Sequence, residues 1–191
     1  MLEKIEDELS PAVCQAMKAE LVGRITTAGR REFYFYSAIT DGFREAVLGA
    51  LQNFPGYEFD CDVHHEPEWS QYLDCLYPAP EELERIKNMH LVEQLRENGD
   101  SLEKPRLVRH WAYFASKVDR DEFNGNAQRS GFKVASMSED ASADPSQRFG
   151  VCVERVDSVD WNSINEVTLE LFAFTQAVNG FYDGWETSVE R

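Results

Sequence analysis

The stretch Tyr182-Asp183-Gly184-Trp185-Glu186-Thr187 closes residues 105–191, the half of the chain whose pattern is clearest. That half predicts strand, helix, strand, strand, helix and strand, which is the order of a ferredoxin-like (split βαβ) domain. Because this fold hosts many unrelated functions, the closing stretch says more about function than the fold does. Gly184, set between Asp183 and Trp185, indicates a bulge or a close backbone approach.

Hydrophobic periodicity and helix-capping residues predict the strands and helices of residues 105–191. The predicted strands cover residues 107–115, 132–137, 148–156 and 181–189. Asp119, followed by Glu122 three residues later, predicts the start of a helix that ends at Gly131. A longer helix from about Asp160 to Val178 is predicted to bury Ile164, Val167, Leu171, Phe174 (or Phe172) and Val178.

The sequence of residues 1–104 predicts a similar order of helices and strands, but without the first strand. Ser10-Pro11 predicts a helix start, and Ala28-Gly29-Arg30 predicts the turn of a hairpin. Thr40 or Asp41 is expected to cap a second helix. Acidic and apolar residues alternate over residues 57–64, which predicts a half-buried strand.

A helical bridge is predicted between the two halves. Pro80 opens a helix that ends at Asn98-Gly99, with an apolar stripe of Leu83, Ile86, His90 (or Met89) and Leu95. The predicted domains are residues 1–104, with a connector from residue 66, and residues 105–191. The predicted class is α+β: two ferredoxin-like (split βαβ) halves, the first lacking its opening strand, joined by this bridge.

The charge of the chain constrains its partners. The 35 acidic and 19 basic residues give a formal net charge of −16. Residues 1–104 hold 21 acids and 10 bases (−11), and residues 105–191 hold 14 and 9 (−5). This surplus disfavours nucleic acid, whose binding depends on Lys and Arg, and favours a basic protein partner. A soluble acidic protein with no such partner would have the same charge.

The sequence also predicts where the protein works. It has neither an N-terminal apolar run after Met1 nor a window of about 18–20 apolar residues, so we expect no signal peptide and no membrane partner. Its four cysteines lie far apart, as expected for free thiols in a reducing cytoplasm. We also expect no cofactor and no enzymatic activity, because neither a Gly-x-Ser-x-Gly elbow, a phosphate-binding loop nor a His-Glu-x-x-His helix occurs.

Several motifs carry a resemblance to known families. Residues 107–189 resemble the regulator of ribonuclease activity B family at His110-Trp111-Ala112-Tyr113-Phe114, Ser130-Gly131-Phe132 and, above all, Gly180–Thr187. The resemblance implies an acidic bacterial protein that inhibits ribonuclease E by protein–protein contact. Residues 33–36, 57–59 and 67–72 resemble the domain of unknown function 695 family, which is often fused ahead of a regulator-like domain.

The candidate partner-binding residues lie on two predicted strands: Tyr182, Asp183, Trp185, Glu186, Arg109 and His110. Simple alternation puts Tyr182 on one face of the last strand and Asp183 and Trp185 on the other, which would leave Trp185 partly in water. Alternatively, Trp185 packs on the helix from Asp160 and Gly184 only permits a bulge. Arg109 and His110 could pair with Asp183 or Glu186.

Other interpretations stay open. His64, His65 and Glu66 follow Asp60 and Asp62, but adjacent histidines on a strand point to opposite faces, so no metal site is predicted. An enzyme or small-ligand binder would use a cleft between the halves, and an immunity protein would neutralise a basic nuclease toxin. A homodimer is one way to cover the open sheet edge of the first half.

Overall fold

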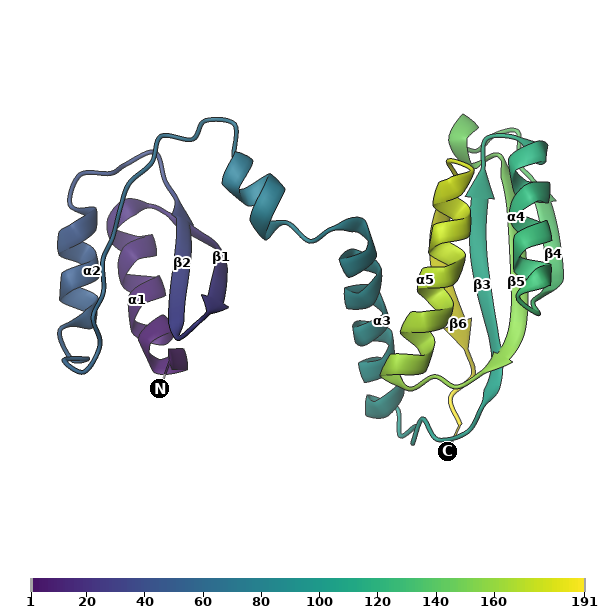
Figure 1. The fold of residues 1–191 in the computed structure, drawn as a ribbon, viewed down its shortest axis with the longest axis horizontal. Coiled ribbons are helices and arrows are strands. Elements are labelled where there is room, and N and C mark those ends of the chain that lie inside the picture. The colour runs from purple at the N-terminus through teal and green to yellow at the C-terminus, as the bar shows by residue number, and fades with distance from the viewer. Residues whose placement is uncertain (1, 191) are drawn as a thin grey trace. The chain divides into compact units, whose positions relative to one another are not determined.

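The computed structural model describes residues 2–190, which form the predicted α+β class with two separate sheets. They divide into two compact units, residues 2–78 and residues 79–190 (Figure 1). The division falls after Pro78, not near residue 104, because helix α3 (Pro80–Glu97) packs along α5 (Trp161–Ala177). None of the helices in residues 2–190 has the length and apolar character needed to cross a lipid bilayer.

The first unit packs two helices against each other beside a hairpin. α1 (Leu2–Met17) contacts α2 (Phe43–Leu51), and β1 (Glu20–Thr27) pairs antiparallel with β2 (Arg30–Tyr36). The predicted hairpin is confirmed, with positive φ at both Ala28 and Gly29 as in a type I′ turn. The buried core consists of Ile5, Leu9, Val13, Met17, Ala19, Val47 and Leu51.

The predicted start of α1 at Ser10 is wrong. The helix is already formed at Leu2 and carries Pro11 in its interior. Pro11 lacks the N–H for one helical hydrogen bond, which costs about 3 kcal/mol. Burial of Ile5 and Leu9 on the same stripe as Val13 offsets that cost, because each buried aliphatic side chain contributes about 1.5–3 kcal/mol. The helical spacing of the buried apolar residues, and not Pro11, therefore determines where α1 begins.

The predicted strand at residues 57–64 is also wrong, since these residues form neither strand nor helix. Asp60 accepts the N–H of Cys61 at 2.9 Å and lies 3.6 Å from the guanidinium of Arg44. A side chain that captures a neighbouring backbone donor competes with sheet pairing. The first unit thus has a two-stranded sheet, and its connector adds only a π-helix, η1 (Tyr72–Leu76).

The second unit contains the predicted strands and helices with small shifts at their ends. Its strands are β3 (Arg106–Phe114), β4 (Lys133–Glu139), β5 (Phe149–Asp157) and β6 (Phe181–Thr187). They form one sheet in the order β4-β5-β3-β6, with every neighbouring pair antiparallel. α4 (Lys117–Arg129) and α5 cover one face of this sheet (Figure 1). A short 3-10 turn, η2 (Pro145–Gln147), lies between β4 and β5.

The start of α4 differs from the prediction by a few residues. Ser116 is the N-cap, and its hydroxyl accepts the N–H of Asp119 at 3.1 Å. Asp119 returns the contact, since its carboxylate accepts the Ser116 hydroxyl at 2.6 Å. Asp119 is therefore the third residue of the helix and not the cap itself.

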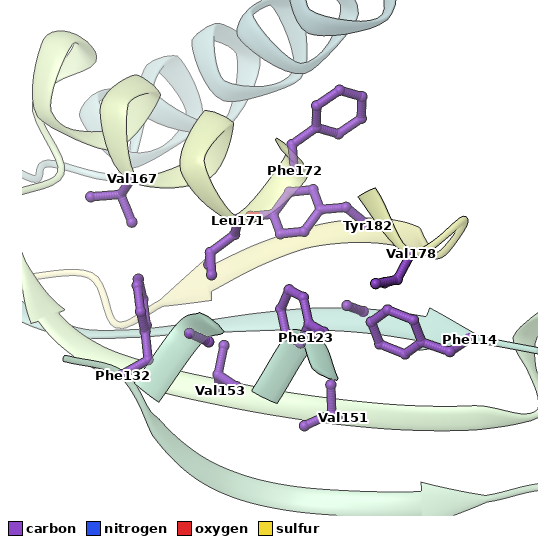
Figure 2. Close-up of a cluster of buried hydrophobic side chains, with 12 residues drawn as sticks. Phe114, Phe123, Phe132, Val151, Val153, Val167, Leu171, Phe172, Val178 and Tyr182 are labelled. Atoms are coloured by element: carbon purple, nitrogen blue, oxygen red, sulfur yellow. The ribbon is translucent and has the colours of Figure 1, made fainter. Parts of the chain in front are cut away.

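The core of the second unit lies between its sheet and the two helices (Figure 2). Val108, His110, Ala112 and Phe114 alternate along β3 toward the helices and are buried. Leu171 and Phe172 of α5 belong to the same cluster, whereas Phe174 is only partly buried. The opposite face of β3 carries the exposed Leu107 and Arg109 and the half-buried Trp111 and Tyr113.

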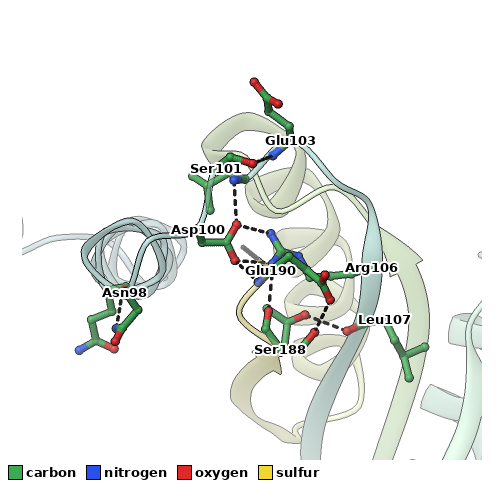
Figure 3. Close-up of polar contacts among 11 residues, drawn as sticks. Asn98, Asp100, Ser101, Glu103, Arg106, Leu107, Ser188 and Glu190 are labelled. Atoms are coloured by element: carbon green, nitrogen blue, oxygen red, sulfur yellow. Dashed lines mark hydrogen bonds and ion pairs between the residues drawn. The ribbon is translucent and has the colours of Figure 1, made fainter.

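A buried ion pair fixes the entry into β3 (Figure 3). Arg106 donates from both terminal nitrogens to the carboxylate of Asp100, and the two side chains are 4% and 0% exposed. Asp100 also accepts the backbone N–H groups of Leu102 and Glu190, each at 2.8 Å. Arg106 donates to the carbonyl of Ser188 at 3.0 Å. The pair therefore holds the residues after β6 beside the start of β3.

We expect Gly180→Ala to destabilise the chain by at least about 2 kcal/mol. A Cβ at this position would lie 2.6 Å from Cδ1 of Phe114 and 2.8 Å from Cγ2 of Thr175, and both side chains are fully buried. Gly125→Ala is the matched control, because its Cβ would meet only the flexible Arg129 side chain at 3.6 Å. The control should be neutral or stabilising in urea unfolding followed by circular dichroism. Equal effects of the two substitutions would contradict the packing.

We expect Asp100→Asn to lower the free energy of unfolding at pH 7 by about 3 kcal/mol, because it removes the charge that Arg106 faces in a dry site. The Arg106 hydrogen bonds, followed by the Glu190 and Leu102 N–H groups, hold the pKa of Asp100 well below its usual range. A carboxylate with a lowered folded-state pKa contributes stability above about pH 4 that is lost as the pH falls further. The gap between the two proteins should therefore shrink below pH 4. Glu190→Gln, which keeps the backbone N–H, should behave like the unmodified chain, and a pH-independent gap would contradict the assignment.

Candidate functional site

A β-bulge in β6 determines how the candidate residues are displayed. Tyr182 pairs with Ala112 and Gly184 pairs with Trp111, so Asp183 is the extra residue between them. Gly184 has φ 139°, a conformation that side-chain-bearing residues rarely adopt. The bulge turns Tyr182 and Trp185 to the same, helix-covered face, where they are 2% and 7% exposed. Simple alternation is therefore wrong here, and the bulge interpretation of Gly184 is confirmed.

Trp185 joins three elements of the second unit through a buried polar network. Its indole Nε1 donates to Oδ1 of Asn88 on α3 at 2.8 Å. The side-chain amide of Asn88 donates in turn to Asn165 at 2.8 Å and to Thr168 at 2.6 Å, both on α5. Thr168 donates to the carbonyl of Ile164 at 2.8 Å. The network fixes α3 and α5 to the edge strand β6.

Tyr182 and His110 pair with each other inside the core and not with surface carboxylates. The hydroxyl of Tyr182 lies 2.8 Å from Nδ1 of His110, and both side chains are buried. Burial, followed by the positive charge of Arg155, lowers the pKa of His110 to about 3. The imidazole is therefore neutral near pH 7. The structure gives this pair a packing role and places it away from solvent.

Arg109 remains on the surface and bridges neighbouring strands. Its Nε donates to Oε2 of Glu154 on β5 at 3.1 Å, and its Nη1 lies 4.0 Å from Oε1 of Glu186 on β6. Of the pairings expected for Arg109, the one with Glu186 exists only at this longer distance. Asp183 and Glu186 are both exposed. These two carboxylates and Arg109 are the predicted site residues that a partner can reach directly.

A groove of about 400 Å³ lies beside the bulge, with α3 on one side and β3 and β6 on the other. It is lined by Glu84, Lys87, Asn88, Leu91, Trp111, Tyr113, Asp183, Gly184, Trp185 and Glu186. Three of these residues are acidic and three are aromatic. Lys87, the one cation in the lining, pairs with Glu84 at 2.7 Å. The groove can accept a cationic group with an apolar body, and we call it the α3–β6 groove.

The contribution of α3 to this groove could not be read from the sequence. The predicted apolar stripe is rotated relative to the buried side, which consists of Glu84, Asn88, Val92 and Leu95. Two of these residues are polar, and the partners of Asn88 come from residues far along the chain. A hydrophobic periodicity cannot detect such positions. Their spacing of three and four residues is a weak signal that they share one face.

The His64–Glu66 segment has a different role. Glu66 accepts hydrogen bonds from the Tyr36 hydroxyl, from Ser70 at 2.9 Å and from the N–H of Gln71. These contacts, led by that of Tyr36, lower the pKa of Glu66. Within residues 2–190, no three His, Cys, Asp or Glu side chains are grouped closely enough to hold a metal ion.

A double-mutant cycle should reveal the network. Trp185→Phe and Asn88→Leu should each cost about 1–3 kcal/mol, because each leaves buried polar groups without partners. The double variant should lose at least about 1 kcal/mol less unfolding free energy than the two single variants lose in sum. The exposed pair Arg148–Glu139, at 2.6 Å, is the control cycle and should couple by less than about 1 kcal/mol. Additive costs at Trp185 and Asn88 in urea unfolding would show that the hydrogen bond contributes nothing.

Comparison with known proteins agrees with the division of the fold. Residues 1–77 match a family of unknown function (DUF695), which corresponds to the first unit. Residues 85–187 match the family described as regulator of ribonuclease activity B, beginning within α3 and ending with β6. No curated protein matches the chain. Since the second match covers more than half of the sequence and one complete sheet, the chain belongs to the regulator of ribonuclease activity B family.

Proposed function

We propose that this protein is a non-catalytic regulator that binds a ribonuclease, with ribonuclease E as the first candidate. Membership of a family of regulators, rather than of catalysts, supports this proposal. The observation that carries it is the acidic surface at the β6 bulge, which belongs to the family-matching unit and presents Asp183 and Glu186 to solvent beside the α3–β6 groove.

Electrostatic steering is the proposed first step of binding. A net charge of −16 attracts a basic protein and repels nucleic acid, so the regulator would meet the enzyme without competing for its RNA. Asp183 and Glu186 lie on β6, the edge strand of the sheet, and both are exposed to an approaching partner. We call the exposed carboxylates of Asp183 and Glu186 the acidic rim. Arg109 pairs with Glu154 and lies 4.0 Å from Glu186, so it helps to orient the Glu186 side of this rim.

The remaining predicted site residues act by positioning in this proposal. Tyr182 and His110 lie in the core and set the path of β6 beneath the rim. Trp185 lines the groove with the small part of its ring that stays accessible. A partner therefore contacts carboxylates and groove walls, and the buried pair maintains their geometry.

Three finer features complete the proposal. The antiparallel order β6-β3-β5-β4, with α4 and α5 on one face, supports a ferredoxin-like second unit. The four cysteines are free thiols, which suits a reducing cytoplasm. The two-stranded sheet of the first unit has edges on which a second copy or another protein could add a strand.

The test is inhibition of purified ribonuclease E on a fluorescent single-stranded RNA. We expect the full chain to slow cleavage, and Asp183→Asn with Glu186→Gln to weaken the complex about tenfold at low salt. Glu97→Gln with Glu122→Gln is the control, because it removes the same charge from exposed positions of the same unit outside the groove.

Two outcomes would count against the proposal in different ways. Absence of both inhibition and binding by the unmodified chain would reject ribonuclease E as the partner. Equal weakening by the test and control pairs would show that net charge, and not the rim at the bulge, determines binding.

A further inference from the structure

The α3–β6 groove has unpaired negative charge. Lys87 is held by the carboxylate of Glu84, which is itself 5% exposed. Arg109 directs its Nε to Glu154 and reaches Glu186 only at 4.0 Å. Among residues 2–190, Asp183 has no ion-pair partner. The groove thus holds more carboxylate charge than its own cations neutralise, which favours a cationic occupant.

The walls of the groove are aromatic. Trp111 and Tyr113 line it from the uncovered face of β3, and Trp185 lines it where its indole donates to Asn88 on α3. Tyr113 and Asp183 both line the groove, and burial, followed by the carboxylate of Asp183, raises the pKa of Tyr113. Aromatic faces beside carboxylates suit a cation that is flat and weakly hydrated. Guanidinium meets this description better than ammonium, because it stacks on rings and donates a bidentate pair to a carboxylate.

The groove is also open and held in place. A Cβ added at Gly184 would have nothing within 4 Å, so no side chain fills the space at the bulge. Asn88 and Trp185, on opposite walls, are joined by a hydrogen bond of 2.8 Å. A site whose walls are already fixed loses little conformational entropy when it is occupied.

We propose that the α3–β6 groove binds an arginine side chain from a basic segment of the partner protein. This inference rests on the proposed function, since it assigns part of the regulator's contact with its target to a specific site. The guanidinium lies against Trp111 and Tyr113 and pairs with Asp183, and the aliphatic part of the arginine packs against Leu91.

A matched pair of peptides tests this site on the full chain. The probes are two blocked nine-residue peptides of alternating glycine and arginine, or glycine and lysine, titrated by calorimetry at low salt. We expect the arginine peptide to bind at least about fivefold more tightly, because only guanidinium combines stacking with a bidentate contact. In nitrogen-15 NMR spectra, it should shift the Gly184 amide and the indole N–H signals of Trp111 and Trp185.

Substitutions separate the groove from general charge attraction. Trp111→Leu should remove most of the preference for arginine, and Asp183→Asn should weaken both peptides, with a larger loss for arginine. Glu122→Gln is the control for charge and should leave the preference unchanged. Equal affinity for the two peptides, or a preference that survives Trp111→Leu in a chain with an unchanged circular dichroism spectrum, would falsify the inference.

The experiments can reject the groove assignment and the ribonuclease assignment independently of each other. If ribonuclease E is inhibited but Trp111→Leu and Asp183→Asn leave both inhibition and the arginine preference intact, the groove assignment is overturned while the proposed function stands. If the arginine peptide binds as described and ribonuclease E is neither bound nor inhibited, ribonuclease E is rejected as the partner and the groove assignment stands.

Discussion

The hydrogen bond from Trp185 to Asn88 is the interaction on which the geometry of the second unit depends. It joins an edge strand to a helix from the preceding segment, and Asn88 passes the connection on to α5 through Asn165 and Thr168. Trp185 can reach Asn88 only because the bulge at Gly184 reverses the direction of its side chain. Without the extra residue Asp183, the indole would face the opposite side of the sheet. One backbone irregularity thus creates the groove, the acidic rim and the attachment of α3.

The architecture of the second unit could be predicted because its elements are locally consistent. Alternation along β3, the helix stop at Gly131 and the helix start at Asp160 all agree with the observed fold. The elements of the first unit were harder to predict, because the turn and cap residues there disagree with the tertiary packing. Pro11 indicates a helix start, yet the stripe of Ile5, Leu9 and Val13 extends the helix past it. Residues 57–64 alternate like a strand but have no paired neighbour.

The candidate site could be predicted only in part. Asp183 and Glu186 are exposed on β6, which the sequence pattern was able to suggest. The role of Asn88 depends on partners 77, 80 and 97 residues away, and no periodicity encodes such distances. Tyr182 and His110 were named as candidate partner-binding residues, and His110 was expected to pair with Asp183 or Glu186. Instead both side chains are buried, and the hydroxyl of Tyr182 contacts the imidazole of His110. Each of these differences comes from tertiary contacts and not from an error in local propensity.

The buried imidazole of His110 has a consequence for regulation. A histidine near its ordinary pKa would act as an acidity sensor in the physiological range, but one whose pKa is about 3 stays uncharged throughout it. The charge of His110, which lies beneath the rim, therefore does not change between mildly acidic and neutral pH. Complex formation should instead respond to ionic strength, since the exposed carboxylates are screened by dissolved salt. In a cell, binding at these carboxylates would therefore respond to salt and to the abundance of the target, and His110 would add no sensitivity to proton concentration.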